Sequence, residues 1–381
     1  MQENGLRQVD KRFPKLSKNI KAEILVVGGG ITGIMCSYFL QKAGYTTVVA
    51  EMDEIGSGAS GASSGILYYG TGTNLLPAIK LWGRKPAEFM WKETNASNMQ
   101  LTNFIEKEGL ECGLRKLPCI MAAQNPEEAK FLEAEQKELS KLGFSHKLLD
   151  ESEISKCYSG KNFGSGLIFP NTSQIYPALL AATVAEKFNL PVYENTKIES
   201  VKQANDSLIA KSGEAKISCE KIILATNDFP VLPEKPFGME KFFSQESSVI
   251  FCSQKLKQNE IQKFFPMESV LWTMGADYDI VYTHENRLIL EVYRMQGYKE
   301  KLAAFYPGFN FQPEFQWGSS WGRANDWLPI AGEVEKDIFA AMATSDQGTT
   351  VGCTIARNIV DMVKNRKNSF LDLVNPERFL K

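Results

Sequence analysis

The first strongly patterned segment of the chain is the apolar run Ile24–Val27. A short run of this kind, rich in β-branched residues, is typical of a strand that is covered on both faces. Apolar residues then recur at positions 31, 34, 35, 38 and 39, a spacing that marks one face of a helix. After Gly44, a second β-branched run over residues 46–50 ends at Glu51. The pattern predicts a strand, a glycine turn, a helix and a second strand, in that order.

Three glycines with the spacing GxGxxG lie at the predicted turn: Gly28, Gly30 and Gly33. In a dinucleotide-binding fold the first permits the tight turn, the second lets the backbone approach a pyrophosphate, and the third lets helix and strand pack closely. The N–H groups at the start of the helix, at Ile31 and Thr32, then hold the pyrophosphate together with the positive end of the helix dipole. The turn therefore predicts a dinucleotide site.

Glu51 follows Gly28 by 23 positions and ends the second predicted strand. A carboxylate at this place accepts hydrogen bonds from the adenosine ribose hydroxyls. No arginine follows it to meet a 2′-phosphate, which disfavours NADP. The fingerprint by itself leaves both NAD and FAD open.

The next segment, residues 55–67, is dense in glycine, alanine and serine. Such a backbone can lie flat against a large planar ligand and offer many N–H and O–H donors. The order of its residues resembles the FAD-binding loop of the D-amino-acid-oxidase-like flavoprotein superfamily, which includes glycine oxidase, sarcosine oxidase and D-amino-acid dehydrogenases. Further segments resemble the same family in the same order: 169–180, 192–198, 222–227, 317–332, 346–352 and 375–379.

The resemblance implies FAD as the cofactor. Residues 317–332 and 56–65 contain none of the cysteine or histidine residues that attach flavin in some relatives, so we predict that FAD is bound without a covalent bond. The last helix, which opens at 346–352, is expected to point its N-terminus at the flavin pyrimidine ring and to stabilise negative charge there. The predicted FAD-binding residues are Gly28, Gly30, Ile31, Thr32, Gly33, Glu51, Met52, Gly58, Ala59, Ser60, Ser63, Ser64, Gly65, Ile66, Ile198, Ala225, Thr226, Asn227, Gly348, Thr349 and Thr350.

The fold that the resemblance implies is α/β, or α+β overall. It consists of a Rossmann-like FAD-binding domain of the glutathione-reductase type and an inserted antiparallel-sheet substrate domain. The charged sequence of 125–142 predicts a solvated helix, and alternation over 280–293 predicts antiparallel strands. We expect the FAD-binding domain at 22–90, 165–230 and 315–381, the substrate domain at 91–164 and 231–314, and an N-terminal extension at 1–21.

The resemblance also implies a reaction, the oxidation of a carbon–nitrogen bond. A small amine or amino acid gives a hydride from its α-carbon to flavin N5, and the imine product hydrolyses. Oxygen or another acceptor then takes the electrons. The cofactor supplies the difficult chemistry while the protein orients the substrate. The expected activity is that of an FAD-dependent amino acid or amine oxidase or dehydrogenase.

The substrate anchor departs from the family pattern. Glycine-oxidase-like members carry an arginine in the closing strand that pairs with the substrate carboxylate, and the aligned residue here is Trp321. Arg323 lies two residues on, on the same face of a strand, and we hypothesise that it replaces the anchor. Arg294 is a second candidate, and the alternative for Arg323 is an ordinary salt bridge. Without an arginine anchor, Trp321 and Tyr293 would form an aromatic cage for an amine that has no carboxylate.

Composition narrows the remaining possibilities. The 381 residues carry a formal net charge of −2, so the basic excess of a nucleic-acid-binding protein is missing. Seven scattered cysteines without a CxxC pair, and only two histidines, predict buried reduced thiols and no metal site. No apolar run approaches the roughly 18–20 residues of a transmembrane helix, and residues 1–21 lack the apolar region of a signal peptide. We expect a soluble, cytoplasmic protein of unknown oligomeric state, with peripheral membrane association left open although no basic amphipathic helix supports it.

Two other functions stay open on the sequence alone. The missing arginine favours a flavin-binding subunit that has no turnover of its own. An NAD-dependent dehydrogenase would keep the glycine fingerprint but would leave the loop at 56–65 unexplained.

Overall fold

The apolar run Ile24–Val27 forms strand β2 in the middle of a six-stranded sheet, and all four residues are buried. The computed structural model describes residues 9–228, 242–274 and 279–379. The strand order is β10-β3-β2-β14-β21-β20, and neighbours pair in parallel except for β20 with β21. The predicted strand–helix–strand unit is present as β2, α1 and β3. The bounds are β2 (Ile24–Val27), α1 (Ile31–Lys42), β3 (Thr47–Ala50), β10 (Val192–Tyr193), β14 (Lys221–Leu224), β20 (Ile330–Glu335) and β21 (Ile338–Met342).

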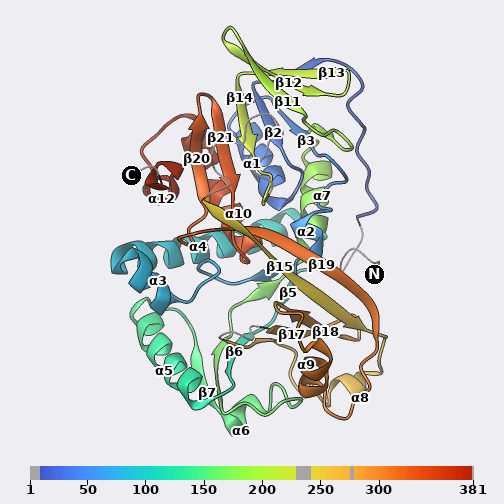
Figure 1. The fold of residues 1–381 in the computed structure, drawn as a ribbon, viewed down its shortest axis with the longest axis vertical. Coiled ribbons are helices and arrows are strands. Elements are labelled where there is room, and N and C mark those ends of the chain that lie inside the picture. The colour runs from blue at the N-terminus through green and yellow to red at the C-terminus, as the bar shows by residue number, and fades with distance from the viewer. Residues whose placement is uncertain (1–8, 229–241, 275–278, 380–381) are drawn as a thin grey trace.

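Both faces of this sheet are covered, as a fully apolar strand requires. Ile24 and Val26 pack in a core with residues of α1, whereas Leu25 and Val27 pack in a second core on the opposite face. Helix α1 packs against α7 (Pro177–Lys187), α10 (Gly348–Arg357) and α11 (Ile359–Val363). The opposite face carries a four-stranded sheet, seen at the top of Figure 1, of β1 (Ile20–Lys21), β13 (Ala215–Cys219), β12 (Ser207–Ser212) and β11 (Ser200–Ala204).

The N-terminal segment, predicted as an extension, is part of this half of the molecule from residue 9 onward. Strand β1 pairs in parallel with β13. The backbone N–H of Phe13 donates to Glu194 Oε2 at 2.9 Å, and that of Leu16 donates to Thr196 Oγ1 at 3.1 Å. These bonds tie the segment to the turn that follows β10.

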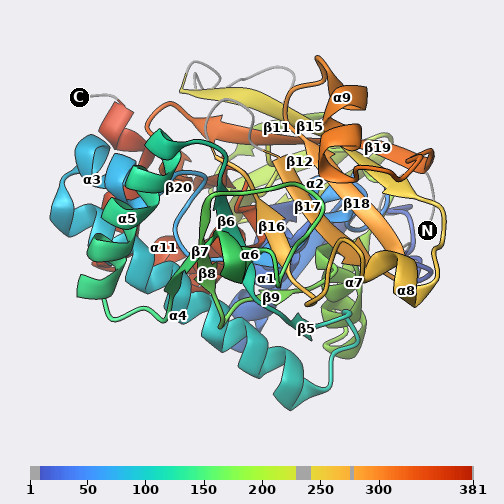
Figure 2. The ribbon, with the colours of Figure 1, turned by 90° about the horizontal axis from the view of Figure 1, so that it is seen from below.

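The second half of the molecule is built on an eight-stranded sheet with the order β19-β15-β18-β17-β16-β6-β8-β7. Its neighbours are antiparallel except for β16 with β6, so the predicted antiparallel pair over 280–293 is present as β17 and β18. The predicted charged helix is α5, which covers β6, β7 and β8 (Figure 2). The strands are β6 (Cys119–Ala123), β7 (Lys147–Asp150), β8 (Ser165–Phe169), β15 (Phe243–Ser253), β16 (Val270–Trp272), β17 (Asp279–His284), β18 (Arg287–Val292) and β19 (Pro313–Ala324), and the helices are α5 (Pro126–Lys141), α6 (Glu151–Ile154), α8 (Gln258–Ile261) and α9 (Tyr298–Phe305).

The borders between the halves differ from the predicted ones. Helix α4 (Arg84–Glu108) runs without a break through the predicted border at residue 90 and crosses the middle of the molecule (Figure 1). Strand β8, placed by prediction in the nucleotide half, pairs with β6 and β7 in the eight-stranded sheet. Segment 317–332 holds parts of two strands, because β19 ends at Ala324 and β20 begins at Ile330 in the other sheet. The differences at β8 and at 317–332 reflect strand pairing between segments far apart in the chain, which local pattern does not encode.

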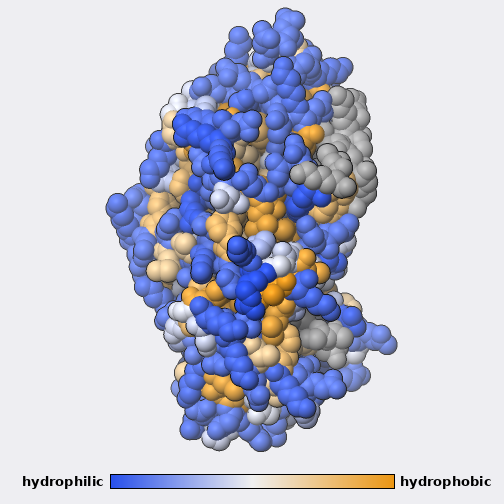
Figure 3. All heavy atoms as spheres, turned by 90° about the vertical axis from the view of Figure 1, so that its left-hand side faces the viewer, coloured by the Kyte–Doolittle hydropathy of each residue, from blue (hydrophilic) through white to orange (hydrophobic). Residues whose placement is uncertain are grey.

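The remaining elements lie outside these three sheets. Among the described residues, no helix has the length and apolar character needed to cross a membrane. The face that carries α3 is mostly hydrophilic, with apolar side chains gathered in patches (Figure 3). The elements outside the three larger sheets are α2 (Ala59–Ala62), β4 (Ile66–Leu67), α3 (Leu75–Trp82), β5 (Arg115–Lys116), β9 (Ser173–Gln174), α12 (Ser369–Val374) and the 3₁₀ turn η2 (Pro376–Phe379). Strands β4, β9 and β5 form a small sheet of their own, and α12 and η2 pack on β20.

Candidate active site

A cavity of about 1290 Å³ runs between the two halves of the molecule. One end is lined by the turn between β2 and α1, and the other by one face of the eight-stranded sheet and the start of α10. This volume exceeds the range of roughly 300–1,000 Å³ that is typical of small-molecule and cofactor sites. The cavity therefore has room for an extended ligand and a second, smaller molecule.

The glycine turn has the close contacts that its sequence predicted. Gly28 has φ +109°, which favours glycine, and a Cβ there would lie 2.4 Å from the carbonyl oxygen of Ala225. A Cβ on Gly33 would lie 2.0 Å from the carbonyl oxygen of Gly28, so helix α1 approaches the strand as closely as backbone allows. No side chain among the described residues caps the first turn of α1 at Gly30, although Ser60 Oγ accepts a hydrogen bond from the N–H of Ile31. The start of α1 thus presents N–H groups and a positive dipole end to the cavity.

Glu51 lies at the same end of the cavity, at the end of β3. Its Oε2 accepts a hydrogen bond from the N–H of Gly29 at 2.6 Å, and its Oε1 accepts one from the N–H of Asp53 at 2.9 Å. Burial raises the pKa of Glu51, while these backbone donors act in the opposite direction. The carboxylate is held beside the glycine turn, where the ribose of a dinucleotide is expected.

The loop from Gly56 to Ile66 lies under the strand β19. Gly56 and Gly65 both have φ +70°, and a Cβ on Gly65 would lie 1.9 Å from the carbonyl oxygen of Ile175. The indole N–H of Trp317 donates to the carbonyl oxygen of Ala62 at 3.1 Å. These contacts fix the loop against both halves and leave its serine hydroxyls along the cavity wall.

The start of α10 faces the other end of the cavity. Gly348 is its first residue, and no described side chain caps its N-terminus. Just before it, Ser345 Oγ, Asp346 Oδ1 and Gln347 Oε1 are shielded from solvent and make no hydrogen bond to any described residue. Buried polar atoms normally have a partner, so this stretch is built to meet a polar ligand.

One face of the eight-stranded sheet forms the wall above these elements. Residues directly opposite one another in neighbouring strands point to the same face. Trp317 is opposite Ile250, which is opposite Glu291, and Glu291 is opposite Ile280. Because side chains two apart in a strand share a face, this register also brings Trp321 and Arg323 to the wall, where both line the cavity. Tyr293, which follows the last residue of β18, lines the cavity beside them.

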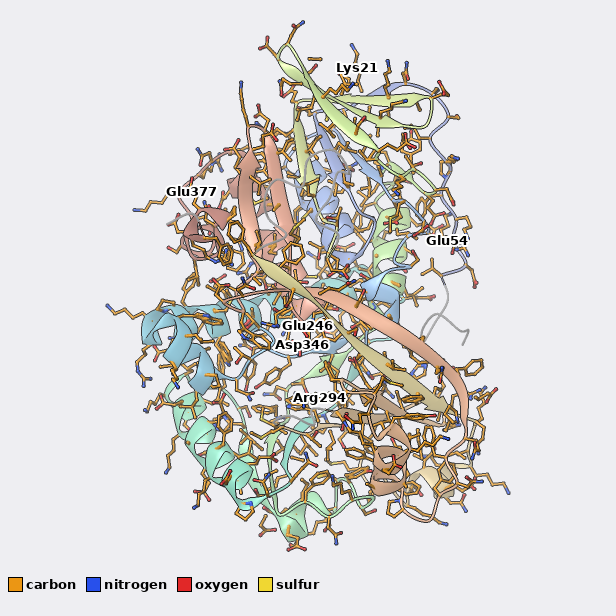
Figure 4. The ribbon with its side chains drawn as sticks, in the orientation of Figure 1. Lys21, Glu54, Glu246, Arg294, Asp346 and Glu377 are labelled. Atoms are coloured by element: carbon orange, nitrogen blue, oxygen red, sulfur yellow. The ribbon has the colours of Figure 1, made fainter. Side chains whose placement is uncertain are left out.

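Arg323 is already paired with an acid on this wall. Its Nε and Nη2 donate to Glu246 Oε1 at 2.9 and 2.7 Å, and its guanidinium lies 4.6 Å from the ring centre of Trp327. Trp321, next to it, is 8% exposed and makes an edge contact with Tyr293 at 5.5 Å. Arg294, the second anchor candidate, is exposed and does not line the cavity. Figure 4 places Glu246 and Asp346 at the middle of the molecule, between the two halves.

The carboxyl groups of Glu291 and Asp346 line the same region, and the pKa of each is raised. Burial raises the pKa of Glu291 to about 7, while the hydroxyl of Ser248, which donates to Oε1 at 2.7 Å, acts in the opposite direction. Burial raises the pKa of Asp346 to about 7 as well, and the negative charge of Glu291 adds to that shift. Both groups therefore change charge near neutral pH, which is a frequent property of active-site residues.

Comparison with known proteins supplies the family. Residues 23–362 match the family described as FAD dependent oxidoreductase, abbreviated DAO. The chain belongs to this family. The DAO family is FAD-dependent, so FAD is the cofactor of this chain.

Three similar proteins illustrate the range of the DAO family. The chain is 23% identical over 258 residues to the probable oxidoreductase OrdL of Haemophilus influenzae, a match that covers 66% of this chain and 60% of OrdL. It is 22% identical over 376 residues to gamma-glutamylputrescine oxidoreductase of Escherichia coli, covering 94% of this chain and 87% of that protein. The structure resembles glycine oxidase from Geobacillus kaustophilus with a TM-score of 0.73 and 17% identity, covering 92% of this chain and 96% of that one. At these identities the likeness establishes the fold alone.

The residues of the cavity fit FAD. The glycine turn leaves no space for a side chain where the pyrophosphate is expected, and unpartnered polar atoms lie at the opposite end near α10. Of the predicted FAD-binding residues, Gly33, Gly65 and Thr350 do not line the cavity. Gly33 and Gly65 serve close backbone packing instead, and Thr350 donates to Asn98 Oδ1 at 2.9 Å. Those that line it are Gly28, Gly30, Ile31, Thr32, Glu51, Met52, Gly58, Ala59, Ser60, Ser63, Ser64, Ile66, Ile198, Ala225, Thr226, Asn227, Gly348 and Thr349.

Sequence reasoning missed the acids of the substrate end: Glu246, Glu291 and Asp346. For Glu291 a signal was present, because a lone acid interrupts the apolar run 288–292 of a buried strand. For Asp346 the signal was its place two residues before Gly348, which opens α10. This helix, predicted as the last one, is followed by α11 and α12. Glu246 had no such signal, because it stands within a run of polar residues, 244–248, in its strand.

The cysteines lie outside the chemistry of the cavity. All seven are buried, and none forms a disulfide. Cys353, on α10, is 4% exposed and packs in the core beside α1. The described residues contain no group of three His, Cys, Asp or Glu side chains able to hold a metal ion.

Proposed function

We propose that this DAO-family chain oxidises the carbon–nitrogen bond of a small amine or amino acid. One observation carries the proposal. The cavity that begins at the dinucleotide turn continues without a break to a wall of aromatic and acidic side chains, so cofactor and substrate share one space. Bound FAD supplies the hydride-accepting chemistry. Relatives named for glycine and for gamma-glutamylputrescine support an amine-bearing substrate.

The residues of the chain prepare this space for the reaction. The uncapped start of α10 directs N–H groups and a positive dipole end toward it, which favours negative charge on a ligand there. Trp317 and Trp321, which are 5% and 8% exposed, shield the space from water. Glu291 and Asp346 hold or release protons near neutral pH, which suits a site that handles an amine in both its charged and neutral forms.

The test is anaerobic reduction of the purified yellow protein by a panel of substrates. The panel contains glycine, sarcosine, D- and L-amino acids, proline, opines and simple amines including polyamines. Loss of the visible absorption of oxidised flavin with one class of amine, and not with matched alcohols, is the expected result. A protein that no member of the panel reduces would instead be a flavin-binding subunit without turnover.

A substrate that lacks a carboxylate is a second candidate within the same chemistry. The observation that favours it is the ion pair between Arg323 and Glu246, because a paired guanidinium offers less to an incoming carboxylate. The same panel separates the two candidates by comparing amino acids with their decarboxylated amines.

A further inference from the structure

The substrate end of the cavity carries an excess of acid. We infer that Glu291 and Asp346 bind the positively charged ammonium group of an amine that has no carboxylate at that end. The inference rests on the proposed function and adds the charge class of the ligand. It is carried by the balance of charge, by unpartnered buried oxygen atoms and by the aromatic wall.

The balance of charge comes from the residues that line the cavity. Among the described residues, those at the substrate end are four acids and one base: Asp228, Glu246, Glu291, Asp346 and Arg323. This base is bound through two nitrogen atoms to Glu246. The other three acids have no cationic side chain among the described lining residues of this end, since Lys197 lies beside Ile198 at the nucleotide end.

Glu291 and Asp346 each have a buried carboxylate oxygen atom that would be stabilised by a positively charged ligand. Glu291 is 4% exposed, and its Oε2 is shielded from solvent and makes no hydrogen bond of normal geometry to any described residue. The hydroxyls of Ser64 and Tyr293 lie close enough to this carboxylate to lower its pKa, so donors already gather around it. Asp346 Oδ1 is shielded from solvent in the same way. A buried carboxylate oxygen without a donor loses its hydration, so it is stabilised by a ligand that brings N–H donors and positive charge.

The aromatic wall completes the site. Tyr293 directly follows the last residue of β18, lines the cavity and makes an edge contact with Trp321. Trp272 belongs to the same face, because it is opposite Ile280. Aromatic faces attract organic cations, whereas they give nothing to a carboxylate.

The same features exclude two other ligands. A metal ion would need at least three suitable side chains together, and the described residues offer no such cluster. A carboxylate would meet Glu291, Asp346 and Glu246, and like charges brought together in a partly dry cavity repel strongly.

The experiment compares two ligands that share a tert-butyl group and carry opposite charges. The tert-butyl group carries an ammonium group in tert-butylamine and a carboxylate in pivalate. Neither has a hydrogen on the carbon that bears the charged group, so binding is measured without oxidation at that carbon. Purified FAD-loaded protein is titrated anaerobically at about neutral pH, and binding is followed by the perturbation of the oxidised flavin spectrum. tert-Butylamine should bind about tenfold or more tightly than pivalate.

Variants identify the residues responsible. Glu291→Gln and Asp346→Asn keep the side-chain volume and should each weaken tert-butylamine binding by about tenfold. Glu133→Gln, on the exposed side of α5 and away from the cavity, should leave the affinity unchanged. FAD content and the unfolding temperature of each variant are compared with the parent protein, and the parent's own preference between the two ligands stands as a test even where a variant does not fold.

The outcomes separate this inference from the proposed function. Equal or tighter binding of pivalate, or an unchanged affinity for tert-butylamine in both variants, would overturn the inference. Reduction by amino acids together with tight pivalate binding would leave the proposed function intact and end the inference. Tight tert-butylamine binding in a protein that no amine reduces would support the inference and end the proposed function.

Discussion

Arg323 and Glu246 form an ion pair across two neighbouring strands at the wall of the cavity. Arg323 Nε and Nη2 lie 2.9 and 2.7 Å from Glu246 Oε1. The register of β15 and β19 sets Arg323 opposite Ser244 and Trp321 opposite Glu246, so the pair is a diagonal contact on one face. Arg323, which was hypothesised to anchor the substrate, is therefore already bound to a carboxylate of the protein.

Replacing Arg323 should therefore not raise the KM of the substrate, as the loss of a carboxylate anchor would. Arg323→Gln frees the carboxylate of Glu246, which should lower the KM of a cationic amine. An exposed or partly buried pair contributes about 0.5–1 kcal/mol, which corresponds to a change of about two- to fivefold. Glu246→Gln should shift the KM in the opposite direction. Steady-state kinetics on the best amine of the panel provides the measurement, and a raised KM for a carboxylate-bearing substrate in Arg323→Gln would show that the arginine anchors the substrate.

The glycine turn should control the FAD content of the protein. A Cβ at Gly33 would lie 2.0 Å from the carbonyl oxygen of Gly28, so Gly33→Ala must push α1 away from the turn. We expect FAD affinity to fall by about tenfold or more, because the N–H groups of the turn lose their positions. The measurement is the ratio of flavin to protein absorption after purification. Gly164→Ala serves as the control, since a Cβ there meets nothing within 4 Å, and a normal ratio in Gly33→Ala would contradict the prediction.

Stability should depend on pH through a buried acid outside the cavity. Glu135 on α5 is fully buried, and its oxygen atoms accept hydrogen bonds from the N–H groups of Leu75 and Leu76 at 2.6 and 2.9 Å. Burial raises its pKa from 4.5 to about 7. Between these values the folded protein binds more protons than the unfolded chain, so the free energy of unfolding falls as the pH rises through that window.

Glu135→Gln should flatten this dependence. As the pH rises from about 4.5 to about 8, the parent should lose up to roughly 3 kcal/mol of its free energy of unfolding relative to the variant. Each unit of pKa shift is worth about 1.4 kcal/mol. Urea unfolding of both proteins at the two pH values gives the comparison, and shifts from Glu291 and Asp346 cancel in the difference. Parallel pH curves for the two proteins would refute the assignment.

The flavin should be released by acid precipitation. Within the described residues that line the cavity there is neither a cysteine nor a histidine. Cys353, the cysteine closest in sequence to the turn before α10, is 4% exposed and lies in the core. The yellow colour is therefore expected in the supernatant after precipitation, and colour that stays with the protein would mean a covalent bond.

Much of the nucleotide end was predictable because its signals are local. The apolar run of β2, the three glycines and Glu51 are neighbours in sequence, and each has a role set by backbone geometry within one strand–helix–strand unit. The contribution of β8 to the second sheet was not predictable in this way. Its five residues read equally well as a strand in either half, and its partners β6 and β7 are chosen by long-range pairing.

The cofactor end is encoded locally, because a dinucleotide turn is specified by residues within about one turn of helix and two short strands. The charge of the substrate end depends instead on how distant segments pack together. Glu246, Glu291, Arg323 and Asp346 come from four separate elements, and strand register alone decides that three of them share one wall. Whether Arg323 faces a ligand or a glutamate depends on that register, and a register is fixed by the packing of whole sheets.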